Sequence, residues 1–419
     1  MPSTTMLFPW VRAAPAHARS TRSNVWLLIV GASALRAAGY VYPFLSYRLG
    51  ELGFSPRAVS GVLTLFGVGW LAGQILWGQL ADTLGRRTTL VGAMTLAAVV
   101  LPLLAETAAP VAIGTASVIA GMCYDAPRPV ISAVVSDEIT DRGRRASITG
   151  WRHFGVNVGA AVTGASGGLL ADQVGLPFLF WANAAACAAF AIAVRLGMPA
   201  DQSASTNGRS GHGVHTALLR DGRLWLLWLA SVLALTPAAG LFSILPLLMA
   251  SQGMPAAAYG WTQVASAAAV LLLSIPLNGW LKQKAKTSPM VGLLAVSSLI
   301  LGAGIGAGGL AASPLQYAAA AAAAVPGEII AFVAASAALD KIAPPHARGL
   351  YAGIWGSTLA TAVICAPLLA GWSLTQGGPH LVALSTFACG ALGALVCLPL
   401  ALLLPRDHPS EALQPASRL

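Results

Sequence analysis

The sequence has 419 residues, of which 56% are hydrophobic and only 9% are charged. A soluble globular chain carries roughly 25% charged residues, so this composition excludes an ordinary water-soluble protein. The net charge of +10 does not indicate a nucleic-acid-binding protein, because the basic residues lie singly or in small groups between long apolar runs. That distribution is typical of a polytopic membrane protein.

The apolar runs predict twelve membrane-spanning helices. A spanning helix needs about 20 mostly apolar residues, and strands are not expected because open sheet edges cannot lie in hydrocarbon. The predicted spans of the first half are 24–45, 57–81, 88–107, 110–133, 146–170 and 177–197. Those of the second half are 223–250, 257–281, 288–311, 315–339, 347–371 and 381–404.

Basic residues are concentrated on one side of the membrane in the predicted topology. Of the odd-numbered connections, only the first carries basic residues, Arg48 and Arg57. The tails, the even-numbered connections and the span ends next to them hold most of the other bases, including Arg12, Arg19, Arg22, Arg86, Arg87, Arg142, Arg144, Arg145, Arg209, Arg220, Lys282, Lys284, Lys286, Lys341, Arg348, Arg406 and Arg418. Because cytoplasmic loops are rich in Lys and Arg, we expect both termini in the cytoplasm.

The longest connection between spans divides the chain into halves. It is rich in Ser, Gly and His, which is the composition of a flexible linker. The expected organisation is a cytoplasmic tail (1–23), a six-helix bundle (24–197), a cytoplasmic linker (198–222), a second six-helix bundle (223–404) and a cytoplasmic tail (405–419).

The two halves share a weak sequence repeat. Asp137-Glu138-Ile139 corresponds to Asp340-Lys341-Ile342 at an offset of 203 residues, and Asp125 corresponds to Glu328 at the same offset. Such a repeat predicts two pseudo-symmetric bundles of one plan, which is a transporter architecture with its substrate site near the membrane midplane.

A short motif follows the second predicted span. Residues 78–87 read Gly-Gln-Leu-Ala-Asp-Thr-Leu-Gly-Arg-Arg. This resembles the G-x-L-x-D-x-x-G-R-[RK] signature of the major facilitator superfamily at the same place in the chain. The resemblance implies an all-α integral membrane fold of twelve helices in two bundles, with helices 1, 4, 7 and 10 lining a central cavity.

The resemblance also implies a cytoplasmic latch that forms and breaks during transport. We expect Gly78 to let helix 2 approach a neighbour closely and Gly85 to permit the tight reversal. The other expected latch residues are Asp82, Arg86 and Arg87, with Asp137 and Asp340 as partners at the ends of helices 4 and 10. The alternative is that the two arginines only set the topology.

Helix 5 is rich in glycine, with Gly155, Gly159 and Gly164 followed by the pair Gly167-Gly168. It resembles the glycine-rich helix 5 of drug:proton antiporters, although no proline precedes the closing pair. Ordinary packing of small residues is the alternative reading. The glycine series from Gly302 and the alanine run 318–324 are likewise expected to permit close helix contacts.

Charged residues at membrane depth are costly and need a function or a partner. The predicted substrate and proton pathway consists of Arg36, Tyr40, Asp125, Arg128, Arg152 and Glu328. Two arginines near Asp125 should hold it ionised, whereas Glu328 lacks a basic neighbour on its own helix until Lys341. Desolvation therefore favours the protonated form of Glu328, and Arg36 could reverse this in one conformation. A structural ion-pair network is the alternative.

These patterns predict a secondary transporter that exports a small organic molecule in exchange for protons. An importer or an anion carrier of the same fold is the alternative. The sequence contains no HExxH, GxSxG or P-loop motif, so neither an enzyme nor an ATP-driven pump is expected. We expect no cofactor and no metal, and a monomer in the cytoplasmic membrane whose partners are substrate, protons and lipid.

The predicted topology can be tested with reporter fusions. A reporter that works only in the cytoplasm should be active when it is fused after Leu419, because the arginines and lysines place both termini there. Activity of a periplasmic reporter at the same position would overturn the even number of spans.

Overall fold

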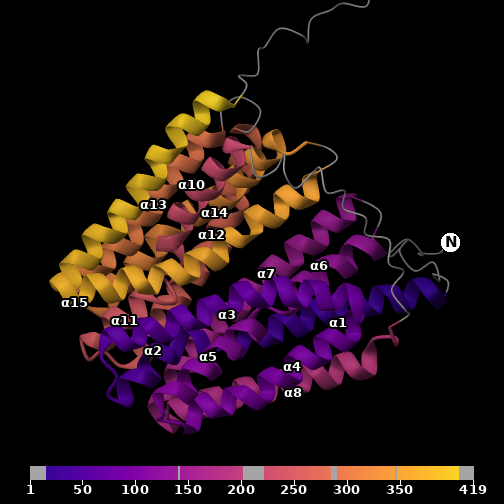
Figure 1. Cartoon of the computed structure of the whole chain (residues 1–419), viewed down its shortest axis with the longest axis horizontal. Helices are drawn as coiled ribbons and strands as arrows, with labels where there is room; N and C mark the ends of the chain where they lie inside the picture. Colours follow the sequence, from indigo (N-terminus) through magenta and orange to yellow (C-terminus); the bar gives the residue numbers. More distant parts are fainter. Residues whose placement is uncertain (1–15, 140–141, 202–220, 285–289, 345–346, 405–419) are drawn as a thin grey trace, which may run out of the picture. The chain divides into compact units, whose positions relative to one another are not determined.

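The computed structural model describes residues 16–139, 142–201, 221–284, 290–344 and 347–404. Within these ranges the chain is helical and contains no strand (Figure 1). The helices of the first half are α1 (Ala16–Ala37), α2 (Val41–Glu51), α3 (Pro56–Thr83), α4 (Arg86–Glu106), α5 (Pro110–Tyr124), α6 (Pro127–Glu138), α7 (Arg142–Val174) and α8 (Leu176–Gly197).

The second half continues with long apolar helices. They are α10 (Gly222–Ala239), α11 (Ile244–Ser251), α12 (Ala256–Lys284), α13 (Met290–Gly306), the short 3-10 helix η1 (Ala307–Leu310), α14 (Pro314–Ile342) and α15 (Arg348–Leu403). Ten segments of the described chain are long and apolar enough to cross a membrane.

The twelve predicted spans are recovered when two features are considered. α15 contains two spans, because Gly378 has a φ of 67° and interrupts the helix between them, just before Pro379. The fourth predicted span is present but divided into α5 and α6. The all-α membrane fold of the prediction is thus confirmed.

Three spans that we expected to be continuous are broken. The first is interrupted between Ala37 and Val41, the fourth at Asp125, and the seventh between Ala239 and Ile244. Asp125 has non-helical angles at the second break, with φ −117° and ψ 19°, and Pro127 lacks the N–H donor that would continue the helical hydrogen bonds across it. Hydropathy does not reveal such breaks, because the apolar run continues through them.

By contacts, the chain forms two compact units. The first comprises Met1–Val41 and Gly69–Thr206, and the second comprises Tyr42–Val68 and Asn207–Leu419. The second unit therefore includes most of α2 and the first part of α3. The boundaries predicted from the repeat, 24–197 and 223–404, remain a prediction.

In the first unit, α3 and α5 are in close backbone contact. A Cβ atom placed on Gly69 would lie 2.0 Å from the carbonyl oxygen of Val118, and one on Gly73 would lie 2.2 Å from that of Met122. The close approach expected at Gly78 stays a prediction. No atom of the described residues lies within 4 Å of a Cβ at Gly78, which is one turn beyond the contact.

In the second unit, small residues also bring helices together. A Cβ on Gly304 of α13 would lie 2.8 Å from the Cα of Ala324 in α14, and one on Gly302 would lie 3.0 Å from the Cα of Gly390 in α15. The expected role of the glycine series and the alanine run is confirmed. Figure 1 shows α10, α13, α14 and α15 packed side by side in this unit.

The helix contact at Gly73 can be tested against Gly78. Gly73→Ala should lower the melting temperature by several degrees, since overpacking costs about 1–3 kcal/mol and the clashing atom belongs to backbone. Gly78→Ala should leave it unchanged or raise it slightly, because alanine is the better helix former. Equal melting temperatures of the two purified variants would contradict this packing.

Candidate functional site

Arg36 lies in the last turn of α1, at the first break. Its guanidinium donates a hydrogen bond to the Tyr124 hydroxyl and lies 5.9 Å from the centroid of the Tyr124 ring. The rings of Trp70 and Tyr124 are packed in an edge-on arrangement, with centroids 5.0 Å apart. The two breaks of α1/α2 and α5/α6 are thereby joined through a cation and an aromatic ring.

Asp125 occupies the second break, directly after Tyr124. Its carboxylate oxygen lies 3.2 Å from an Arg128 nitrogen, and the two side chains are 25% and 40% exposed. Arg152 of α7 donates to the Ser132 hydroxyl at 3.4 Å, and this hydroxyl donates in turn to the Arg128 carbonyl. The structure thus brings Arg36, Asp125, Arg128 and Arg152 into one region of the first unit, which we call the arginine cluster.

Tyr40 and helix α7 complete the surroundings of this region. The Tyr40 hydroxyl is hydrogen-bonded to the Ser166 hydroxyl at 2.9 Å, and the Thr163 hydroxyl donates to the Arg36 carbonyl. A Cβ on Gly155 would lie 2.2 Å from the Ser33 hydroxyl oxygen, and Gly159 also packs against α1. These two helix 5 glycines therefore serve close packing between α1 and α7.

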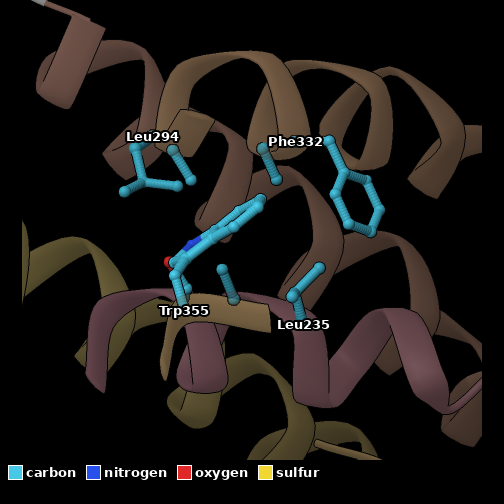
Figure 2. Close-up of a pocket in the computed structure, with 8 residues that line it drawn as sticks. Leu235, Leu294, Phe332 and Trp355 are labelled. Carbon is cyan, nitrogen blue, oxygen red and sulfur yellow. The ribbon is translucent and has the colours of Figure 1, made fainter. Parts of the chain in front are cut away.

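The second unit contains a small apolar pocket between α10, α13, α14 and α15. Figure 2 shows the Trp355 ring within it, with Leu235, Leu294 and Phe332 around the ring. The remaining lining residues are Ser231, Ala234, Ala331 and Ala335. Half-buried Glu328 lies one turn before Phe332 on the same face of α14. Its position is therefore one helical turn from the pocket.

Two tryptophans fix α15 to α10 beside the pocket. The indole N–H of Trp355 donates to the Ser231 hydroxyl at 3.1 Å, and that of Trp228 donates to the Ser357 hydroxyl at 3.0 Å. These bonds satisfy the polar edges of both indoles, so the Trp355 ring is held as an ordered apolar wall.

The turn of the sequence motif lies between α3 and α4. Gly85 has a φ of 92°, which confirms that a glycine permits the reversal. Asp82 is exposed at the end of α3, and the Arg87 guanidinium donates to the Arg195 carbonyl at the end of α8.

The expected latch partners stay untested. The side chain of Asp137 lies outside the described residues, and Asp340 is exposed at the end of α14 in the second unit. The pairing of Arg36 with Glu328 also remains a prediction, since these residues belong to different units.

Asp201 binds the motif turn, which the sequence did not suggest. Its carboxylate accepts hydrogen bonds from the backbone N–H of Arg87 at 3.0 Å and of Thr88 at 2.8 Å. It therefore caps the first turn of α4. A Cβ on Gly85 would lie 2.2 Å from the Asp201 carboxyl carbon, so this glycine is needed for space as well as for its backbone angle.

The pKa of Asp201 reflects this contact. Partial burial raises the pKa, but the hydrogen bonds from Thr88 and Arg87 outweigh burial and hold it below its ordinary value. The sequence carries no local signal for the contact, because Asp201 and Arg87 are 114 residues apart.

Asp221 performs a similar task at the start of the second half. Its side chain accepts from the Arg223 backbone N–H as the N-cap of α10, and from the Tyr351 hydroxyl of α15 at 2.9 Å. Burial raises its pKa, whereas the hydrogen bonds from Arg223 and Tyr351 lower it overall. An aspartate directly before an apolar helix is a recognisable capping signal.

Comparison with known proteins decides the family. A sequence model of the family described as "Major Facilitator Superfamily" matches residues 26–327 and 227–419. The chain belongs to the major facilitator superfamily. It is accordingly a membrane transporter rather than an enzyme, and the small molecule it moves is its substrate.

Solved structures agree with this fold. A POT family transporter in complex with a thioalcohol-conjugated peptide is 15% identical with a TM-score of 0.71, covering 94% of this chain and 96% of that one. The nucleoside transporter NupG is 15% identical with a TM-score of 0.67, covering 91% and 98%. No curated protein sequence matches significantly. The membership in the drug:proton antiporter group is not decided by these similarities.

The Asp201 contact can be tested by substitution. Asp201→Ala should destabilise the purified protein by about 1–2 kcal/mol, the usual effect of losing a helix cap, whereas Asp172→Ala at an exposed position of α7 should not. The lowered pKa means that the stabilisation is present above the ordinary pKa of aspartate and is lost as the pH falls through the folded value. The difference between wild type and Asp201→Asn should therefore shrink below about pH 4, and a difference that grows in acid would contradict the assignment.

Proposed function

We propose that the chain exports a small organic molecule across the cytoplasmic membrane in exchange for protons. The observation that carries this proposal is the pair of broken spans joined by Arg36 and Tyr124, with Asp125 and Arg128 at the second break. Irregular backbone at membrane depth is tolerated where it is enclosed by protein or lines a water-filled cavity. Charges at such breaks are typical of binding and ion-coupling sites in transporters.

The two carboxylates have different proposed roles. Asp125 is paired with Arg128 at 3.2 Å. Glu328 is half-buried one turn from the apolar pocket on α14, and the sequence of that helix contains no basic residue before Lys341. We therefore assign Glu328 as the group that carries the proton and Asp125 as a structural ion pair.

Import of an anion is the second candidate function. Among the described residues of the first unit, the arginine cluster contains three guanidinium groups and one carboxylate. An excess of arginine suits a carboxylate or phosphate substrate. The structural neighbours are a peptide and a nucleoside transporter by their names, so import remains an open direction for this chain.

Transport in proteoliposomes tests both candidates. The purified full chain is reconstituted with a pH-sensitive dye inside, and organic cations, zwitterions and anions are added under a pH gradient of either sign. Proton movement dependent on added compound supports coupling, and the sign of the gradient that drives accumulation gives the direction. Exchange of compound without any proton movement would reject proton coupling.

The coupling assignment predicts distinct variants. Glu328→Gln should lose gradient-driven accumulation by at least tenfold yet keep exchange at equilibrium, because the neutral amide cannot release a proton. Asp125→Asn should lower the melting temperature by leaving Arg128 without its carboxylate. If Glu328→Gln still accumulates compound while Asp125→Asn does not, the two roles are reversed.

The latch is proposed on the completeness of the motif and the position of Asp82 at a helix end. Asp82 would pair with Arg86, Arg87 or basic groups on moving elements, and Asp137 and Asp340 would receive the arginines in one conformation. Asp82→Asn should reduce transport at least tenfold at normal expression. Wild-type transport rates in this variant would remove the latch assignment.

A further inference from the structure

Aromatic rings fill one region of the second unit, where α2 and α3 meet the α10–α11 connection and α12. Its members are Tyr42, Phe44, Tyr47, Phe66, Phe242 and Tyr259. The closest pairs, by ring centroids, are Tyr42–Phe66 at 4.8 Å, Phe44–Tyr259 at 5.6 Å, Tyr47–Tyr259 at 6.0 Å and Tyr42–Phe242 at 6.4 Å. We call this set the ring cluster. The rings are packed against one another at the start of α12, and those of Tyr42, Phe44, Tyr47, Phe66 and Tyr259 are buried.

Gln263 follows Tyr259 by one turn on the same face of α12. The residue is 2% exposed, and neither the Nε2 nor the Oε1 atom of its side chain has a hydrogen-bond partner among the described residues. The neighbouring Thr262 differs, since its hydroxyl donates to the Ala258 carbonyl of the same helix at 3.1 Å.

An unbonded amide at this depth needs an explanation. Gln263 is the eighth residue of α12, so it lies about 10 Å along a membrane-spanning helix at 1.5 Å per residue. Buried polar groups are normally hydrogen-bonded, and leaving one unbonded is costly. A leucine would fill the position without that cost. The glutamine therefore lowers the stability of this conformation, as residues kept for function commonly do.

We propose that Gln263 binds the transported solute through an edge that presents both a hydrogen-bond donor and an acceptor. A primary amide side chain donates from Nε2 and accepts at Oε1, so its complement is a carboxamide or a similar donor–acceptor edge. The ring cluster one turn away adds a preference for a flat ring. The substrate class is thus a small aromatic compound with an amide-like group. This inference rests on the proposed transport function and adds a substrate class to it.

The conformation described here closes Gln263 off from solvent. A solute reaches it only after the elements that cover this face of α12 have moved, which an alternating-access cycle provides. Specificity follows from the same physics, because a compound lacking the donor leaves the amide partly unbonded and is rejected.

The experiment compares two compounds of nearly the same shape on the purified full chain. Benzamide carries both donor and acceptor, and acetophenone replaces the amide nitrogen by a methyl group. Apparent affinities come from titrations of the melting temperature. Wild type should bind benzamide about tenfold more tightly than acetophenone, the value of one hydrogen bond. Gln263→Leu should abolish this difference, while Thr262→Val, the matched control, should keep it.

The melting temperature without compound separates function from structure. Gln263→Leu should melt at or above the wild-type temperature, because it removes an unbonded polar group. A loss of several degrees would mean that Gln263 has a structural partner, and this would overturn the proposal. Equal affinity of wild type for the two compounds would overturn it too.

Transport separates this inference from the proposed function. If wild-type and Gln263→Leu proteoliposomes accumulate the same compounds equally under a pH gradient, the transport function stands and the role of Gln263 falls. If wild type moves no compound under any gradient, while benzamide binding still depends on Gln263, the proposed function fails and the binding site stands.

Discussion

Lipid offers the backbone no hydrogen-bond partner, so the N–H and C=O groups of each membrane-spanning segment must be satisfied within the protein. Long helices satisfy their N–H and C=O groups internally, which is why apolar runs of about 20 residues dominate the sequence. A break in such a helix frees several of these groups at once. The chain has breaks in its first, fourth and seventh spans. The first two of them carry the contact of Arg36 with Tyr124 and the ion pair of Asp125 with Arg128.

Helix association in this environment depends on close packing instead of the hydrophobic effect. Glycines therefore act as contact surfaces, as Gly69 and Gly73 do against the α5 backbone and Gly304 does against α14. The cost is a loss of adaptability, since backbone atoms at 2–3 Å from a missing Cβ cannot move aside. Larger residues at these glycines would therefore disturb the helix packing inside each unit.

The sequence predicted helix positions well because length and hydropathy are local properties. It missed the breaks, since Arg36 and Asp125 are single polar residues within runs that stay apolar on average. It did not indicate the close contacts of Gly69 and Gly73, because these glycines precede the motif and follow no recognisable pattern. Gly85 was predicted correctly, as a tight turn between two helices restricts its backbone without regard to the rest of the fold.

The contacts that were not predictable join residues far apart in the chain. Tyr124 and Arg36 are 88 residues apart, and neither residue type indicates the other. Asp125 with Arg128 was accessible because a separation of three residues places both side chains on one helix face. Gln263 has no sequence signal at all, since a lone glutamine in an apolar helix gains meaning only from the lack of partners around it.

The contact between Asp201 and Gly85 has a mechanical consequence. The carboxylate sits in the space where a side chain would otherwise be and holds the first N–H groups of α4. Asp201 is also the last described residue before 202–220, the stretch that leads to the second half. The residues that follow α8 are therefore fixed to the α3–α4 turn at Asp201, so a displacement of α4 at its first turn also displaces Asp201.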